Sequence, residues 1–408
     1  MNEGSSLENL IARKDPVLFE GRVGLLSNQI SYSFLHKKYL FEVLSHRRVL
    51  KSIFIPEHGL FGELQDQIPL DSVASYRQIA PGSTFRSLYQ SNKDRSLRIQ
   101  KEDLTGLDVM IVDVQDVGSR YYTYLSTIKY LFETITENGL SIKVIFLDHT
   151  NPTGRQVEGS MMLPCFSSFI GPEKLPHRYG LSIGEIAALF NHLHNHQIDL
   201  EVIKGTRDTF PIQPSPNIPD VETCLLYSGQ CLVEGTILSE GRGTTLPFKL
   251  VGAPFLEWNV LLRIRENVEK QVKPYNFLRE GIFLRPLFFK PKFDKWSDQT
   301  CGGFQLHLTG HQFHSLLYSS ILLRTIAEVR SHQSIWRKGR YEYGNDGDAI
   351  QLLAGDHEIL KYLFGETDLV DLIEYLEAEE KVWLHFVNGS QLLATNPYSL
   401  LVQSRSKT

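Results

Sequence analysis

Long apolar segments are missing from this chain of 408 residues. No run approaches the roughly 20 apolar residues of a membrane-spanning helix. Residues 1–16 are polar and lack the apolar centre that a signal peptide needs. We therefore expect a protein without a membrane partner, located in the cytoplasm unless a leader has been removed from it.

Cysteine is also scarce. The four cysteines include no C-x-x-C pair and are too few for a disulfide scaffold; they are Cys165, Cys224, Cys231 and Cys301. Free cysteine is among the most buried residue types, and cytoplasmic thiols stay reduced. We expect all four to be buried, reduced thiols.

An excess of positive charge is absent. The chain has 42 Lys and Arg against 47 Asp and Glu, a formal net charge of −5, and no basic block. This balance argues against nucleic acid or an anionic membrane as a partner. The hydrophobic content of 42% and the charged content of 22% are those of a folded globular protein of two or three domains.

Nucleotide and metal motifs are missing too. No G-x-G-x-x-G follows the first predicted strand, and no G-x-x-x-x-G-K-[ST] occurs anywhere. His192, His194 and His196 lie close together, but no H-E-x-x-H motif accompanies them. We therefore expect neither a cofactor nor a metal.

The first half of the chain alternates between strand-like and helix-like patterns. Short runs rich in Val, Ile and Leu occur at residues 23–26, 49–55, 109–114, 144–147 and 200–203, with helical patterns at 121–137 and 182–194. Runs that are apolar on both faces are typical of buried parallel strands. The alternation predicts an open, doubly wound, mostly parallel α/β sheet.

A proline-rich stretch at residues 211–219 interrupts this pattern and indicates a domain boundary nearby. Beyond it, strand-like runs at 282–289 and 304–308 lie among predicted helices at 312–329, 357–364 and 369–379. We predict a first domain at residues 1–225 and a smaller α+β domain at residues 226–408.

Polar side chains follow four of the predicted strands. They include Asn28 after the first, Glu57 and His58 after the second, Asp116 and Arg120 after the third, and Asn151 and Glu158 after the fourth. Ligands of doubly wound sheets bind outside the carboxyl ends of the strands. The pattern therefore predicts an active-site cleft at this edge of the sheet.

One motif resembles a catalytic signature without its context. Gly180-Leu181-Ser182-Ile183-Gly184 matches G-x-S-x-G, but no strand precedes it. Ser182 followed by Glu185 is instead typical of a capping box at the start of an amphipathic helix. We interpret Ser182 as a helix N-cap.

Carboxyl groups remain as the candidate chemistry. Glu57 follows an apolar strand, whose end favours a protonated carboxyl group, so it is a candidate general acid with His58 beside it. Paired carboxyl groups without metal or nucleotide motifs favour glycoside hydrolysis. The other candidates are the carboxyl groups of Asp116, Glu158, Glu234 and Glu240, and the sugar-binding side chains of Tyr121, Tyr122, Asn151 and Asn217.

Several motifs resemble one known family over residues 21–355 in unbroken order. They are Pro56-Glu57-His58-Gly59, the run from Asp113 to Tyr124, Asn151-Pro152, Val157-Glu158-Gly159, Pro214-Ser215-Pro216-Asn217, the run from Glu234 to Thr244, and Cys301-Gly302-Gly303. The family is that of the NamZ-type exo-β-N-acetylmuramidases. The resemblance implies a Rossmann-like domain without a dinucleotide, and a smaller domain that closes the cleft.

The resemblance also implies removal of N-acetylmuramic acid from the non-reducing end of peptidoglycan fragments. The proposed catalytic glutamate of the family falls on Glu57, and we assign the second carboxylate to Glu158, ahead of Asp116 and Glu240. A carboxylate-bearing sugar needs a cation, and Arg120 and Arg242 are the motif arginines.

Three positions depart from the family pattern. Phe61 replaces a usual Arg, His149-Thr150 replaces Arg-Pro, and Ile237 replaces Asn. They keep two alternatives open: a sugar-binding or muropeptide-binding protein without turnover, and a hexosaminidase with another sugar specificity.

Overall fold

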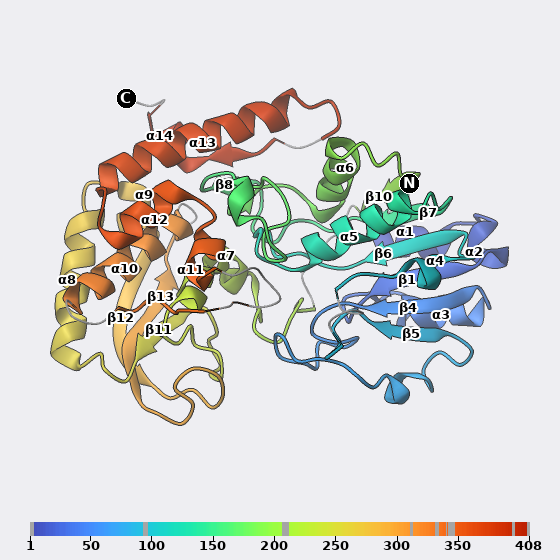
Figure 1. Cartoon of the computed structure of the whole chain (residues 1–408), viewed down its shortest axis with the longest axis horizontal. Helices are drawn as coiled ribbons and strands as arrows, with labels where there is room; N and C mark the ends of the chain where they lie inside the picture. Colours follow the sequence, from blue (N-terminus) through green and yellow to red (C-terminus); the bar gives the residue numbers. More distant parts are fainter. Residues whose placement is uncertain are drawn as a thin grey trace.

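A six-stranded parallel sheet forms one half of the molecule (Figure 1). The computed structural model describes residues 4–92, 97–205, 212–310, 313–330, 334–339, 341, 347–393 and 396–405. The sheet order is β10-β7-β6-β1-β4-β5. Its strands are β1 (Val23–Ser27), β4 (Leu50–Ile55), β5 (Thr84–Ser87), β6 (Val109–Asp113), β7 (Lys143–Leu147) and β10 (Leu200–Ile203).

The five strands expected from the first half of the sequence are confirmed to within one residue at each end. The sixth, β5, was not expected because Phe85 is its only large apolar residue. β5 lies at the edge of the sheet, where alternate residues are exposed and a short apolar run is not required.

Helices cover both faces of this sheet. Met110 and Val112 of β6 belong to a core shared with α5 (Tyr124–Glu137) and α6 (Ile183–Leu193). Val109 and Ile111 face the other way, toward a core shared with α1 (Ser6–Ala12) and α3 (Leu40–His46). The doubly wound α/β fold is therefore confirmed. Two single-turn helices, α2 (Val17–Glu20) and α4 (Lys101–Leu104), also belong to this half.

A smaller antiparallel sheet forms the other half, at the left of Figure 1. Its order is β11-β13-β12, with β11 at Leu250–Ala253, β12 at Ile282–Phe289 and β13 at Cys301–Leu308. The helices are α7 (Val221–Gln230), α8 (Trp258–Val272), α9 (Asn276–Arg279), α10 (Ser315–Val329), α11 (Ala349–Ala354), α12 (His357–Phe364) and α13 (Leu369–Gly389). This sheet and its helices confirm the predicted α+β character of the second half.

The end of the chain returns to its first half. Helix α13 runs along the top of Figure 1, and β14 (Tyr398–Ser399) then pairs with β8 (Gln156–Glu158), which in turn pairs with β9 (Arg178–Tyr179). Helix α14 (Leu400–Arg405) follows β14. One hydrophobic core extends without a break from α5 and α6 to the antiparallel sheet. Long-range pairing of this kind has no local sequence signal.

Several expected boundaries need correction. The helix expected at residues 121–137 begins at Tyr124. The loop before it turns at Gly118 (φ +78°), where a Cβ atom would lie 2.3 Å from the Asn151 side chain. The helix expected at 369–379 extends to Gly389. The expectation for the thiols was wrong at Cys165, which is exposed, whereas the other three cysteines are buried.

The interpretation of Ser182 as a helix N-cap is confirmed. Its hydroxyl group accepts a hydrogen bond from the backbone N–H of Glu185, and the Glu185 carboxylate accepts one from the backbone N–H of Ser182. The same hydroxyl group donates to Asp148 at the end of β7 (3.0 Å). Ser182 therefore has a structural role in starting α6.

Candidate active site

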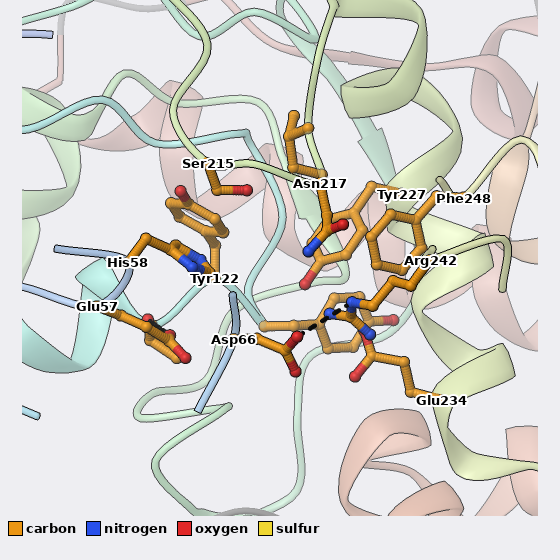
Figure 2. A pocket seen from close by; sticks show the side chains of 13 residues that line it. Glu57, His58, Asp66, Tyr122, Ser215, Asn217, Tyr227, Glu234, Arg242 and Phe248 are labelled. Atoms are coloured by element: carbon orange, nitrogen blue, oxygen red, sulfur yellow. Dashed lines mark hydrogen bonds and ion pairs between the residues drawn. The ribbon is translucent and has the colours of Figure 1, made fainter. Parts of the chain in front are cut away.

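A polar pocket lies beyond the carboxyl ends of β4 and β6, where loops from both halves of the molecule meet (Figure 2). The cavity inside it measures about 30 Å³. It is lined by Glu57, His58, Asp66, Tyr121, Tyr122, Thr123, Ser215, Asn217, Ile218, Tyr227, Glu234, Arg242 and Phe248. Seven residues predicted from the sequence are thus brought together: Glu57, His58, Tyr121, Tyr122, Asn217, Glu234 and Arg242.

Glu57 lies two residues beyond the end of β4, after Pro56, and is 5% exposed. Its Oε1 accepts a hydrogen bond from the backbone N–H of Gln67 (3.0 Å). Its Oε2 accepts from the hydroxyl groups of Thr123 (2.6 Å) and Tyr89 (3.2 Å). The strand therefore delivers the carboxyl group to the pocket, and three donors hold its orientation.

His58 adopts a left-handed backbone conformation (φ +74°), and Gly59 after it has φ +88°. This tight turn reverses the chain at the end of β4. Nδ1 of His58 lies 3.1 Å from the carbonyl oxygen of Leu64. Because a carbonyl group can only accept, Nδ1 carries a hydrogen in this contact, and Nε2 is an acceptor whenever it carries none.

On the opposite side of the pocket, Arg242 is surrounded by carboxylates. Its Nη1 lies 3.0 Å from Oε1 of Glu234 and 2.9 Å from Oε1 of Glu240, and its Nε lies 3.3 Å from Oδ1 of Asp66. Lys295 Nζ contacts Oε2 of Glu240 at 2.9 Å. The expected residue Glu240 thus lies behind Arg242 and holds it rather than lining the pocket.

These charges separate the protonation states of the acids. Burial raises the pKa of Glu234, against the attraction of Arg242. Burial also acts to raise the pKa of Glu240, but Lys295 and Arg242 outweigh it and lower that pKa to about 2. Burial would lower the pKa of Arg242, but the facing carboxylates raise it well above its usual value. The pocket therefore holds a firmly charged arginine beside a glutamate whose charged form is disfavoured by burial.

Aromatic rings form a wall next to this cluster. The guanidinium carbon of Arg242 lies 4.9 Å from the centre of the Phe248 ring, and that ring meets Tyr227 edge to face at 4.7 Å. Tyr121 and Tyr122 come from the loop before α5, and their hydroxyl groups donate to the carbonyl oxygens of Ser228 and Pro214 (both 3.1 Å). Apolar ring faces with a few fixed polar groups are typical of small-molecule sites.

The structure places other predicted site residues outside the lining of this pocket. Glu158 is fully buried: its Oε1 lies 2.9 Å from Nη1 of Arg178, and its Oε2 accepts from the backbone N–H of Leu316 (3.2 Å). Arg120 is also buried, and its guanidinium donates to four backbone carbonyl groups and contacts His177. These contacts favour structural roles over those of second carboxylate and substrate cation.

Three further predicted residues hold turns. Asn28 donates to the hydroxyl oxygen of Tyr124 (2.7 Å), and Asn151 donates to the carbonyl oxygen of Leu181 (2.9 Å). Asp116 accepts from the backbone N–H of Gly118 (2.8 Å) and from the hydroxyl group of Tyr179, and burial raises its pKa to about 7. Polar residues at strand ends can point toward the ligand edge or back into the turn, and sequence order does not distinguish the two.

Sequence reasoning missed part of the lining. Asp66 lies in a loop without a recognisable motif, and Tyr227 and Phe248 are apolar enough to be read as core residues. Thr123 and Ser215 lie inside motifs that were recognised, but they were not assigned a role. Among the residues that the structure describes, no group of His, Cys, Asp and Glu is arranged to hold a metal ion, and no helix is long and apolar enough to cross a membrane.

The fold and the pocket define a Rossmann-like α/β protein with a carboxylate-rich, aromatic-walled site. Comparisons with known proteins identify one family. The models for the N-terminal and C-terminal parts of the exo-β-N-acetylmuramidase NamZ match residues 23–222 and 225–389. The chain belongs to this family.

Individual relatives agree. The chain is 35% identical over 323 residues to the peptidoglycan β-N-acetylmuramidase NamZ of Bacillus subtilis strain 168, which covers 76% of this chain and 73% of that protein. Crystal structures of two DUF1343 family proteins from Bacteroides fragilis are similar in fold, each at 22% identity. Their TM-scores are 0.75 and 0.68, and the similarity covers 93% and 98% of this chain, and 96% and 100% of theirs.

Proposed function

We propose that this protein is a glycosidase that removes N-acetylmuramic acid from the non-reducing end of peptidoglycan fragments. Membership of the exo-β-N-acetylmuramidase family and the activity in the name of the Bacillus subtilis relative support this function. The observation that carries it is the placement of Glu57, a carboxyl group at a strand end that lines a polar pocket with aromatic walls. Carboxyl chemistry of this kind cleaves glycosidic bonds without a metal or a cofactor.

We assign the role of general acid to Glu57. It gives its proton to the glycosidic oxygen as the bond from that oxygen to the anomeric carbon breaks. A water molecule supplies the hydroxyl group of the released sugar, and its remaining proton restores Glu57. His58, with Nε2 as an acceptor beside Glu57, is positioned to bind a sugar hydroxyl group.

Arg242 supports the choice of an acidic sugar. N-acetylmuramic acid differs from N-acetylglucosamine by a lactyl ether that carries a carboxylate, and Arg pairs with carboxylates bidentately. Of the two arginines expected to read this group, Arg242 lines the pocket and Arg120 does not. We therefore assign lactyl recognition to Arg242.

The two family models meet within a few residues, at helix α7. We propose that the chain divides there into two lobes, close to the expected boundary at residue 225, with the pocket at their junction. A cytoplasmic location stays a prediction, and fractionation of cells that produce the protein would test it.

Replacement of Glu57 tests the function. Glu57→Gln keeps the size of the side chain but removes the transferable proton. We expect kcat on a natural disaccharide to fall by about 10²–10⁴, and by less on an aryl glycoside whose activated leaving group needs little protonation. Glu63→Gln is the matched control, since Glu63 lies in the same loop but outside the pocket lining. Turnover of Glu57→Gln at the rate of the control would refute the assignment.

A further inference from the structure

A segment of the chain itself reaches into the pocket through Asp66. The segment of residues 65–67 contacts three side chains that line the pocket, and two of them, Arg242 and Glu57, have substrate roles in the proposed function. Oε1 of Gln65 accepts from the amide of Asn217 (2.7 Å), Oδ1 of Asp66 pairs with Nε of Arg242 (3.3 Å), and the backbone N–H of Gln67 donates to Glu57. Figure 2 shows Asp66 extending toward Arg242, which lies across the pocket from Glu57.

The groups that segment 65–67 offers are those of the proposed sugar. Gln65 presents an amide oxygen, as does the 2-acetamido group of N-acetylmuramic acid. Asp66 presents a carboxylate, as does its lactyl group. The backbone N–H of Gln67 donates to Oε1 of Glu57. This oxygen is one of the two through which the carboxyl group could give a proton to a glycosidic oxygen.

Space and charge both favour movement of this segment when a sugar binds. The remaining cavity of about 30 Å³ holds roughly two water molecules, whereas small-molecule sites measure about 300–1,000 Å³. Arg242 already contacts three carboxyl groups, so the carboxylate of the substrate has to compete with them for the guanidinium group. Glu234 and Glu240 are buried, whereas the Asp66 side chain is 24% exposed. Asp66 is therefore the carboxylate that is able to leave.

The chain around the segment allows such a movement. Backbone hydrogen bonds hold it at Leu64, which donates to the carbonyl oxygen of His58 (3.0 Å), and at Leu70, which donates to that of Tyr89 (2.8 Å). Gly62 before it has φ +70°, and Ile68 after it is 49% exposed. A short segment with few buried apolar contacts between two anchors opens at low free-energy cost.

We propose that segment 65–67 is an internal substitute for N-acetylmuramic acid, and that the sugar binds by displacing Asp66 from Arg242 and Gln65 from Asn217. The inference rests on the proposed function. Displacement also removes the Gln67 N–H from Glu57, which frees Oε1 to carry the catalytic proton. Because Asp66 competes with the lactyl carboxylate, it tunes the affinity of the site for acidic sugars.

Binding of free N-acetylmuramic acid to the whole protein, measured by calorimetry, tests the competition. Asp66→Asn removes the competing charge, so we expect its Kd to be about 5- to 50-fold lower than that of the wild type. The gain for N-acetylglucosamine should be smaller, since that sugar has no carboxylate to benefit from the lost repulsion. Asp71→Asn makes the same charge change at an exposed residue that bonds Ser91, and it should leave both affinities unchanged.

Hydrogen exchange of the wild type gives a second readout. Saturating N-acetylmuramic acid should speed amide exchange in residues 64–70 while slowing it in the loop of Tyr121 and Tyr122. Slower exchange in both regions, or an Asp66→Asn affinity equal to that of the wild type, would overturn the internal-substitute role alone. If neither the wild type nor Asp66→Asn binds the sugar, the proposed function fails and the inference fails with it.

Discussion

Lys295 lies outside the pocket and contacts Glu240, one of the carboxyl groups around Arg242. Its ammonium group contacts Glu240 (2.9 Å) and donates to the carbonyl oxygens of Val233 (3.1 Å) and Leu238 (3.0 Å). It therefore holds the segment that carries both glutamates of the Arg242 cluster. Lys295→Met would remove these contacts while keeping most of the length of the side chain.

The stability that Lys295→Met loses follows from the pKa of Glu240. Burial acts to raise its pKa, and Lys295 and Arg242 together depress it from 4.5 to about 2. A depression of that size corresponds to about 3 kcal/mol of stability above pH 4.5, and this stability is lost as the pH falls toward 2. Since Arg242 remains in the variant, only part of this is forfeited, but lost hydrogen bonds to two carbonyl groups add to it. We expect a total loss of about 3 kcal/mol at pH 7.

Urea unfolding at several pH values measures this loss. The difference between wild type and Lys295→Met should shrink between pH 4.5 and 2, because Glu240 then becomes protonated in both proteins. Lys292→Met is the matched control, since Lys292 lies in the same loop and pairs with Asp298 in solvent, and it should not change stability measurably. A loss that is equal at pH 7 and pH 3 would refute the role of the Glu240 charge.

Three further predictions concern single side chains. Ser182→Ala should cost about 0.5–2 kcal/mol in thermal unfolding while turnover per folded molecule stays unchanged, and a lost kcat would contradict the capping role. Arg242→Gln should lower kcat/KM for muramic acid glycosides more than for glucosamine glycosides, whereas Arg120→Gln should impair folding without altering that ratio; equal losses for Arg242→Gln would exclude lactyl recognition. Burial raises the pKa of Asp116 to about 7, so the wild type loses stability as the pH rises from about 4 to 7. Asp116→Asn has no such group, so its unfolding free energy in urea, relative to that of the wild type, should be up to about 4 kcal/mol higher at pH 8 than at pH 4. A stability difference that does not change with pH would show that Asp116 does not titrate as proposed.

Local sequence patterns were enough to predict most of the fold. The buried strands β1, β4, β6, β7 and β10 are continuous apolar runs, and the start of α6 has a complete capping box, so pattern and structure agree. The edge strand β5 and the pairing of β14 with β8 depend on partners distant in sequence. No periodicity within either segment records those partners.

The candidate site divides in the same way. The positions of Glu57 and His58 could be predicted, because the end of β4 and the tight turn after it are local features of the sequence. The same reasoning could not distinguish the role of Arg242 from that of Arg120, since both lie within recognisable motifs. Only the packing around them shows that backbone carbonyl groups surround one guanidinium and pocket carboxylates surround the other.

The sequence by itself determined the doubly wound sheet, the edge at which the pocket forms and the family that the chain resembles. Each of these depends on residue order over short distances, where apolar periodicity and turn chemistry act directly. The tertiary structure alone decided which carboxyl groups face one another. It brought Asp66 to Glu234 and Arg242, which lie in a distant segment of the chain, and it buried Glu158 against Arg178. Charge pairing depends on the distance through space, and only the folded chain sets that distance.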